Sequence, residues 1–192
     1  MDTITLDVQP IELTDEQFFK LCQANRDLRF ERSATGELLI MAPTGWKTGN
    51  WSGRITQQLF NWVDSNNLGI AFDSSTGVRL PNGADRSPDA SWVRWEKLEA
   101  LNPDPTKFLP LAPDFVVELR SPTDKLKTLQ SKMQEYIDNG VQLGWLIDPK
   151  HQRVEIYRQG QEVEILESPI SLSGEDVLPG FVLSLAPLWD SV

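Results

Sequence analysis

Glu118 is a charged residue in an otherwise apolar run, with Val116 and Val117 before it and Leu119 after it. Such a run predicts a central strand, because strands covered on both faces of a sheet are almost uniformly apolar. An unpaired carboxylate there would cost several kcal/mol, on the order expected when an ion loses its water. Glu118 therefore needs a partner, which is either a metal ion or a cation such as Arg120 or a lysine of the following helix.

A second acid could share a metal ion with Glu118. Asp114 falls on the same face of the predicted strand, but at ~3.3 Å per residue the two acids stand about 13 Å apart. A carboxylate on a neighbouring strand, about 4.8 Å to the side, could meet Glu118. Asp89, directly after Pro88, is the candidate. The alternative is that Asp89 only begins a strand.

The elements that must position these acids follow from apolar periodicity. Steps of three and four residues predict an amphipathic helix from Thr48 to Asn66. A second helix is expected after the Glu118 strand, capped by Ser121, with Pro122 in its first turn and Gly140 at its end. Strands are expected at 70–72, 77–80, 88–93, 113–120 and 144–149. This order predicts an α/β (α+β) fold with a mixed sheet and helices on its faces.

Shorter elements are expected at both ends of the chain. A helix near the N-terminus should be capped by Thr14, with Gln17 completing a capping box. Two strand-like runs, 28–32 and 37–41, flank a turn and predict a β-hairpin, and 154–157 with 163–166 predict another. With no internal repeat or low-complexity tract, residues 1–192 are expected to form a single domain.

Composition narrows the setting. Eighteen Lys and Arg against twenty-eight Asp and Glu give a net charge of −10, so a nucleic-acid site would have to be a local exception. One cysteine, Cys22, rules out an internal disulfide framework. No basic leader and no apolar run of ~20 residues is seen, and a cytoplasmic protein without a membrane segment is expected.

Other chemistries find little support. His151 is the one histidine, which argues against a histidine-based triad and a structural zinc site. The stretch from Thr44 to Gly49 has two glycines and a lysine before a helix, but its spacing fits no phosphate-binding loop.

Four segments together resemble the Uma family of putative restriction endonucleases, within the PD-(D/E)XK nuclease-like superfamily. They are SPDASWV at 87–93, PDFVVELRSP at 113–122, KMQEY at 132–136 and GWLIDP at 144–149. The similarity extends from the hairpin at 31–41 to the segment ending at Phe181.

The resemblance implies a restriction-endonuclease-like αβββαβ core with added β-hairpins at both ends. It implies that Asp89 and Glu118 chelate a divalent ion, with the backbone carbonyl of Leu119 as a third ligand. Oxygen ligands of this kind suit Mg²⁺ or Mn²⁺. The implied activity is that of a metal-dependent endonuclease that hydrolyses phosphodiester bonds of DNA, where the ion activates a water molecule.

The sequence departs from the superfamily pattern at Arg120, where many relatives carry a lysine. Arginine stays protonated and could give only electrostatic help. In relatives of the Uma type the lysine stands on the following helix, and the matching residue is Lys132, whose stem could run toward the sheet. The alternative for Lys132 is an ordinary surface lysine.

Further residues are expected to support this site or bind DNA. Glu31 and Glu37 could supply an additional acid, and Lys125, Lys127 and Lys47 are candidate nucleic-acid contacts. The competing hypothesis is a catalytically inactive module that binds nucleic acid or protein, favoured by the net charge and the missing in-strand lysine. Three tryptophans, at 46, 51 and 189, are expected to be exposed and to form the interface of a homodimer.

Overall fold

The core of the protein is a six-stranded sheet, seen in a computed structural model that describes residues 4–189. Its strands β8 and β9 are parallel and every other neighbouring pair is antiparallel, as predicted for a mixed sheet. In spatial order the strands are β11 (Glu164–Glu167), β10 (Arg153–Arg158), β9 (Leu143–Asp148), β8 (Phe115–Leu119), β7 (Ala90–Arg94) and β4 (Gly69–Asp73).

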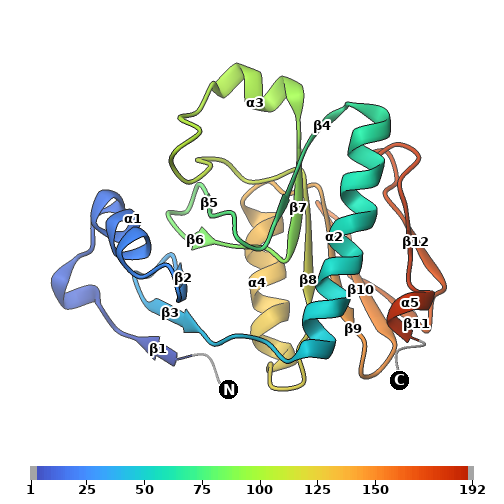
Figure 1. The fold of residues 1–192 in the computed structure, drawn as a ribbon, viewed down its shortest axis with the longest axis horizontal. Helices are drawn as coiled ribbons and strands as arrows, with labels where there is room; N and C mark the ends of the chain where they lie inside the picture. Colours follow the sequence, from blue (N-terminus) through green and yellow to red (C-terminus); the bar gives the residue numbers. More distant parts are fainter. Residues whose placement is uncertain (1–3, 190–192) are drawn as a thin grey trace.

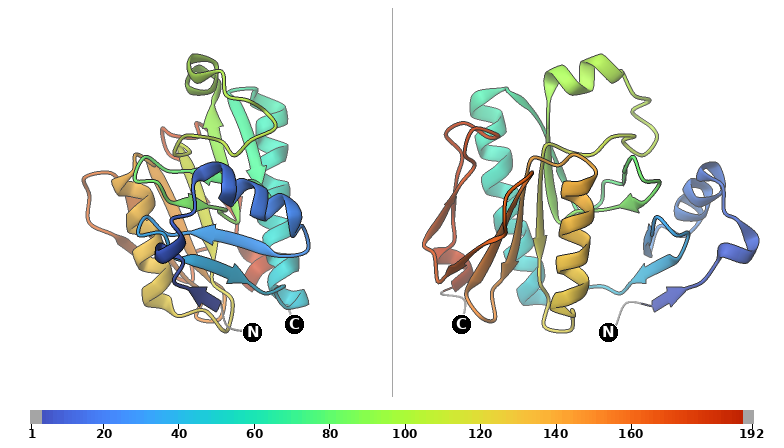
Figure 2. Two further views of the ribbon diagram at one scale, coloured as in Figure 1. Left: turned by 90° about the vertical axis from the view of Figure 1, so that its left-hand side faces the viewer. Right: turned by 180° about the vertical axis from the view of Figure 1, so that it is seen from behind.

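Two helices cover opposite faces of this sheet (Figures 1 and 2). Helix α2 (Trp46–Asn66) packs on the face that carries Phe115, Val117 and Leu119, whereas α4 (Leu126–Asp138) packs on the face that carries Val116. The side chains of β8 therefore alternate as predicted. The alternation places Glu118 on the α4 face.

The α2 face also carries the last elements of the described chain. The hairpin of β12 (Ser171–Ser173) and β13 (Val182–Ser184) and the short helix α5 (Ala186–Trp189) place Leu172, Leu183 and Leu188 in the same apolar cluster as α2. Phe115 and Trp145 meet edge to face within it, with ring centroids 4.7 Å apart. This packing fixes β8 and β9 from one side.

A second sheet lies beside the core, formed mainly by the N-terminal part of the chain (Figure 1). The predicted hairpin is confirmed as β2 (Arg29–Arg32) and β3 (Leu38–Met41). Its neighbours in the sheet are β1 (Ile4–Leu6), β5 (Val78–Arg79) and β6 (Asp85–Arg86). Strand β5 lies within the run predicted at 77–80, and it belongs to this sheet rather than to the core.

Three helical segments complete the described chain. Helix α1 (Asp15–Ala24) has the predicted capping box, because the Thr14 hydroxyl accepts from the Gln17 N–H and the Gln17 side chain accepts from the Thr14 N–H. The other two are the 3₁₀ turn η1 (Gln9–Ile11) and helix α3 (Trp95–Leu101). No helix among residues 4–189 is long and apolar enough to cross a membrane.

Buried ion pairs hold the second sheet together. Asp85 on β6 accepts from Arg32 Nε at 2.8 Å and from Arg79 Nε at 2.7 Å. Arg32 also reaches Asp15 of α1 at 2.6 Å. Because Arg32 and Asp85 are both buried, each charge needs the other to replace the stabilisation that water would give.

The predicted start of the second long helix is wrong. Ser121 does not cap it: its hydroxyl lies 3.2 Å from the Thr123 hydroxyl, while Asp124 accepts the Ser121 N–H at 2.8 Å and returns its own N–H to the Ser121 carbonyl at 3.1 Å. These bonds close a turn, and α4 begins at Leu126 with Lys125 at its N-cap position. Pro122 therefore lies in the turn and outside the helix.

The expectation of three exposed tryptophans holds for one of them. Trp46 is 81% exposed at the start of α2. Trp51 is 7% exposed, because it falls on the apolar stripe of α2 that faces the sheet. Trp189 is half-buried against the same cluster, and its indole N–H donates to the Pro169 carbonyl at 2.6 Å.

Asp85→Ala should destabilise the protein by about 3 kcal/mol, because it leaves the buried Arg32 guanidinium without its main counter-charge. Urea unfolding followed by circular dichroism measures the change. Asp104→Ala is the control, since Asp104 is an exposed loop residue whose carboxylate accepts from the N–H and the hydroxyl of Thr106 in the same loop. Equal stability of the two variants would show that the Asp85 ion pairs are dispensable.

Candidate active site

Asp89 and Glu118 lie opposite each other on neighbouring antiparallel strands. Ala90 of β7 pairs with Val117 of β8, so the same register continued by one residue sets Asp89 against Glu118. Side chains of directly opposed residues share one face, with Cβ atoms ~5 Å apart. The lateral pairing that was predicted from strand spacing therefore agrees with the register. Glu118 is 4% exposed, whereas Asp89 is half-buried.

The backbone N–H of Leu119 bonds to a side chain, and not to the backbone of the neighbouring strand. Its N–H donates to Asp89 Oδ2 at 2.8 Å. In an extended strand the N–H and C=O of one residue point to the same edge, so the Leu119 carbonyl also faces the β7 side. The residue opposite it in the continued register is Pro88, which has no N–H to donate. The carbonyl therefore points toward the Asp89 side of the strand, and the residue opposite it, Pro88, cannot donate a hydrogen bond to it.

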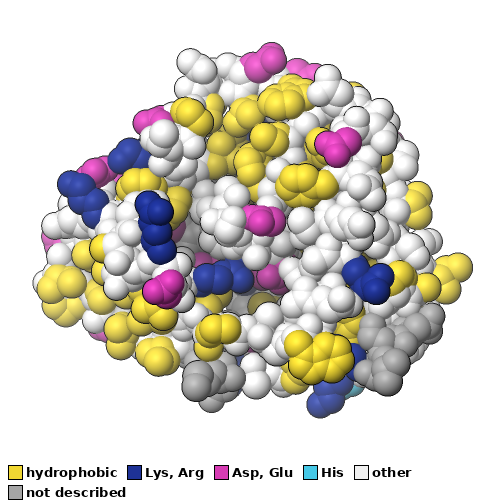
Figure 3. Space-filling view, in the orientation of Figure 1, with side chains coloured by type: hydrophobic (Ala, Val, Ile, Leu, Met, Phe, Trp, Pro, Cys, Tyr) yellow, Lys and Arg dark blue, Asp and Glu magenta, His cyan; other side chains and the backbone are white. Residues whose placement is uncertain are grey.

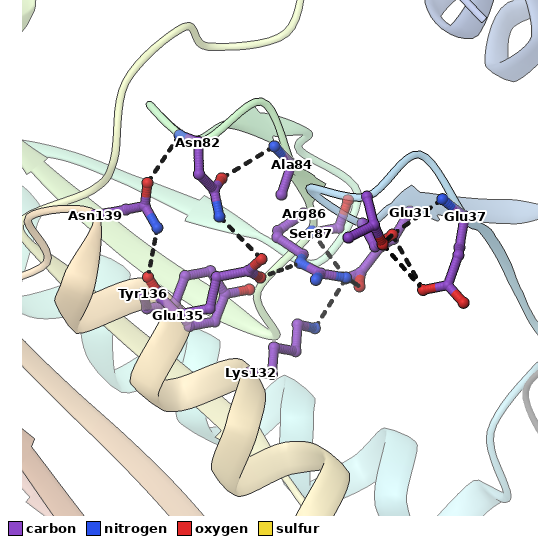
Figure 4. Close-up of polar contacts among 12 residues, drawn as sticks. Glu31, Glu37, Asn82, Ala84, Arg86, Ser87, Lys132, Glu135, Tyr136 and Asn139 are labelled. Atoms are coloured by element: carbon purple, nitrogen blue, oxygen red, sulfur yellow. Dashed lines mark hydrogen bonds and ion pairs between the residues drawn. The ribbon is translucent and has the colours of Figure 1, made fainter. Parts of the chain in front are cut away.

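Lys132 extends from α4 into the gap between the two sheets (Figure 4). Its ammonium lies 2.8 Å from Glu118 Oε1 and 2.8 Å from Glu31 Oε1, and its side chain is only 13% exposed. The expectation that its stem runs toward the sheet is confirmed. The cation next to Glu118 is thus a helix lysine, and Arg120 is not its partner.

Glu31, from β2 of the second sheet, has both of its carboxylate oxygens occupied. Oε1 accepts from Lys132 and from the Ser87 N–H at 3.0 Å, and Oε2 accepts from Arg86 at 3.2 Å. Arg86 also donates to Glu135 of α4 at 2.6 Å. Glu31 therefore contributes to the site through its ion pair with Lys132.

Tyr136 is the second donor to Glu118. Its hydroxyl is 2.9 Å from Glu118 Oε1, and the side chain is fully buried one helical turn after Lys132. From the sequence, no role in the site was expected for Tyr136. The signal that could have revealed the contact is its four-residue spacing from Lys132 on the face that meets Glu118.

The acids and the lysine have displaced pKa values. Burial raises the pKa of Glu118, Lys132 counteracts this and the charge of Asp89 adds to it, for a value of about 7. Burial also raises the pKa of Asp89, in spite of the Leu119 N–H. Burial alone would lower the pKa of Lys132, but Glu118 and Glu31 outweigh it and raise that pKa, so Lys132 is a cation at neutral pH.

Glu31 is shifted in the opposite direction from Glu118. Burial would raise its pKa, but the charges of Lys132 and Arg86 outweigh that effect and lower it. Glu31 is therefore the permanent anion of the cluster.

The remaining supporting candidates lie elsewhere. Arg120 pairs with Asp148 at the end of β9 at 2.5 Å and donates to the Asp124 carbonyl at 3.2 Å. Glu37 accepts from Ser33 and Thr35 in the hairpin turn, to one side of the cluster in Figure 4. Neither approaches Glu118 through a hydrogen bond or ion pair within residues 4–189.

The candidate DNA-contacting lysines lie at helix starts. Lys125 and Lys127 are exposed around the first turn of α4, and the Lys47 ammonium lies 5.3 Å from the centre of the Trp51 ring in α2. Side chains of both charges are visible in a recess between the N-terminal elements and the core (Figure 3). The molecule as a whole carries a net charge of −10.

Asp114, the acid first considered as a partner for Glu118, has a structural role. Its carboxylate accepts from Arg94 at 3.1 Å and from Gln142 at 3.2 Å, and Lys97 lies 3.7 Å away. These contacts join β7, β8 and β9 at the end of the sheet opposite Glu118, in agreement with the predicted separation of the two acids.

The donor atoms around Asp89 and Glu118 fit a hard divalent cation. In the described part of the chain no cluster of three His, Cys, Asp or Glu side chains could hold a metal ion. Mg²⁺, however, is commonly bound through one or two carboxylates, with water completing its shell. Two opposed carboxylates and a carbonyl that lies opposite a proline supply such a set.

Comparison with known proteins agrees with this fold. Residues 15–186 match the model of the Uma2 family, described as "Putative restriction endonuclease". A crystal structure of a putative nuclease of DUF820 from Anabaena variabilis superposes with a TM-score of 0.71 at 22% identity, covering 83% of this chain and 89% of that one. No curated protein matches the chain. The chain belongs to the Uma2 family of putative restriction endonucleases.

Proposed function

We propose that this protein is an endonuclease that hydrolyses phosphodiester bonds of DNA with the help of Mg²⁺ or Mn²⁺. The observation that carries the proposal is the placement of Asp89 opposite Glu118, with the Lys132 ammonium 2.8 Å from Glu118. Two carboxylates at the ends of neighbouring strands can hold a divalent cation that assists the hydrolysis of a phosphodiester, and the lysine of α4 adds a positive charge beside them.

The order of the elements supports a restriction-endonuclease-like core. Along the chain, α2, β4, β7, β8, α4 and β9 occur in this order, which is the αβββαβ order that the resemblance implies, with helix α3 inserted between β7 and β8. The short strands β5 and β6 between β4 and β7 belong to the second sheet. In this arrangement β7 and β8 contribute the acids and α4 contributes the lysine.

Asp89 and Glu118 would hold the cation, with the Leu119 carbonyl as a third protein ligand. When bound, such an ion supplies a water molecule of lowered pKa and neutralises charge on the phosphate. The Leu119 N–H fixes Asp89 Oδ2, so that Oδ1 is the oxygen left for the ion. The partial exposure of Asp89 gives the ion and a phosphate access from solvent.

Lys132 would act as a charged group and not as a base. With Glu118 and Glu31 beside it, its pKa is raised, and it keeps its proton on Nζ near neutral pH. A fixed ammonium stabilises the negative charge that develops on the phosphoryl oxygens. Glu31 holds it in place from the second sheet, and Arg86 of β6 in turn pairs with Glu31.

DNA would approach with its backbone near the exposed lysines at the start of α4, Lys125 and Lys127, and near Lys47. The charge of −10 disfavours binding elsewhere on the molecule, since most of the surface repels a polyanion. Contact with DNA is therefore expected to be confined to the side of the molecule that holds the site.

A second candidate is an inactive module that binds nucleic acid or protein. The observation in its favour is that Lys132 and Glu118 already form a complete buried ion pair, which can exist for structural reasons alone. The two functions differ in whether the acids bind a metal ion and whether DNA is cut.

Glu118→Gln should reduce the nicking of supercoiled plasmid DNA by roughly 100-fold or more, because the ion loses one of its two carboxylates. Glu155→Gln is the matched control: Glu155 is an equally buried glutamate of the same sheet that bonds Gln130 of α4. Agarose gels with Mg²⁺ or Mn²⁺ measure the rate. Equal cleavage by wild type and Glu118→Gln would contradict the proposed role of Glu118, and no cleavage by the wild type would favour the inactive module.

Lys132→Arg should retain about ten times more nicking activity than Lys132→Gln, because the arginine keeps the positive charge and the glutamine removes it. Initial rates on the same plasmid test this, with circular dichroism to confirm folding. If the two variants were equally inactive while still folded, the role of Lys132 would be proton transfer or exact geometry, and charge alone would be excluded.

Mn²⁺ should raise the melting temperature of the wild type, since it binds the folded state alone. At 100 times its Kd a ligand adds about 2.7 kcal/mol, which for a chain of this size corresponds to roughly 5–10 °C. EDTA should reverse the shift, and Asp89→Asn should abolish it. An unchanged shift in Asp89→Asn would place the ion at another site.

A further inference from the structure

The two oxygens of the Glu118 carboxylate are used differently. Within residues 4–189, its hydrogen bond and its ion pair both fall on Oε1: the Tyr136 hydroxyl at 2.9 Å and the Lys132 ammonium at 2.8 Å. A carboxylate oxygen has about two lone-pair sites. Oε1 is therefore saturated, and the free lone pairs of Glu118 lie on Oε2.

A second buried tyrosine–glutamate pair shows that this asymmetry is not general. Tyr157 on β10 donates to Glu155 Oε2 at 2.7 Å, but Gln130 contacts both oxygens of that carboxylate, at 2.9 and 3.1 Å. Arg153 adds an ion pair to Oε1 at 3.3 Å. Glu155 is occupied on both oxygens, as expected for a structural group, whereas Glu118 is occupied on one.

From this contrast we infer that Tyr136 is a positioning residue, which turns the Glu118 carboxylate so that Oε2 faces the divalent cation beside Asp89. The inference rests on the proposed function. Tyr136 is suited to the task because its ring is locked in the core between the α4 and β8 side chains, and its single O–H can be given to one oxygen. Lys132, a flexible chain, could not fix the carboxylate plane by itself.

Tyr136→Phe removes the hydroxyl and keeps the ring, which lies 5.8 Å from the Lys132 ammonium. Without the hydroxyl, Glu118 can rotate about its last bond, and the apparent Kd for Mn²⁺ should rise by roughly 10-fold or more, as for other residues that orient metal ligands. Isothermal titration with Mn²⁺ alone measures the Kd in the absence of DNA.

Tyr157→Phe is the control, because it removes the same kind of hydroxyl–carboxylate bond from an equally buried tyrosine. Both variants should lose similar stability in melts without metal, but only Tyr136→Phe should bind Mn²⁺ more weakly. Its nicking rate should recover toward wild type at high Mn²⁺, since the defect is in ligand orientation.

Two results would overturn the inference while leaving the proposed function intact: wild-type Mn²⁺ affinity in Tyr136→Phe, or an equal loss of affinity in Tyr157→Phe. A wild-type protein that neither binds Mn²⁺ nor nicks DNA would overturn the proposed function and, with it, this inference.

Discussion

The buried contact of Lys132 with Glu118 and Glu31 is the interaction on which the arrangement of the site depends. It joins β2 of the second sheet, which is distant in the sequence, to the consecutive elements β8 and α4 of the core. Removing three charged groups from water is costly, and their mutual attraction compensates only if every remaining polar atom is paired. The Ser87 N–H, Arg86 and Tyr136 meet this condition for Glu31 and for Oε1 of Glu118, whereas the proposed function leaves Oε2 of Glu118 for the metal ion.

This requirement separates the two glutamates. Glu31 receives two cations and a backbone N–H, so it stays ionised and serves as an anchor. Glu118 shares one cation and faces the charge of Asp89, so burial raises its pKa. A buried carboxylate with a raised pKa is stabilised as an anion by a further positive charge close to it. Burial, which makes the charges of the cluster costly in the folded protein, therefore also favours the binding of a cation by Asp89 and Glu118.

The sequence predicted those features that depend on local spacing. Strand geometry alone paired Asp89 with Glu118 and separated Asp114, because distances along and between strands are fixed. The start of α4 was predicted too early, because Ser121 and Asp124 bond to each other in a turn that precedes the helix. Trp51 was expected to be exposed although the apolar stripe of its helix contains it. The contacts of Glu31 with Lys132 and Arg86 join residues up to 101 positions apart, and no local pattern specifies them.

The central claim is that Asp89 and Glu118 share one divalent cation. A crystal grown or soaked with Mn²⁺, with diffraction recorded at the manganese absorption edge, tests it directly. The account predicts one anomalous peak between the two carboxylates, about 2.1 Å from an oxygen of each and close to the Leu119 carbonyl. A Mn²⁺ peak elsewhere, or no peak here in crystals soaked well above the measured Kd, would contradict it.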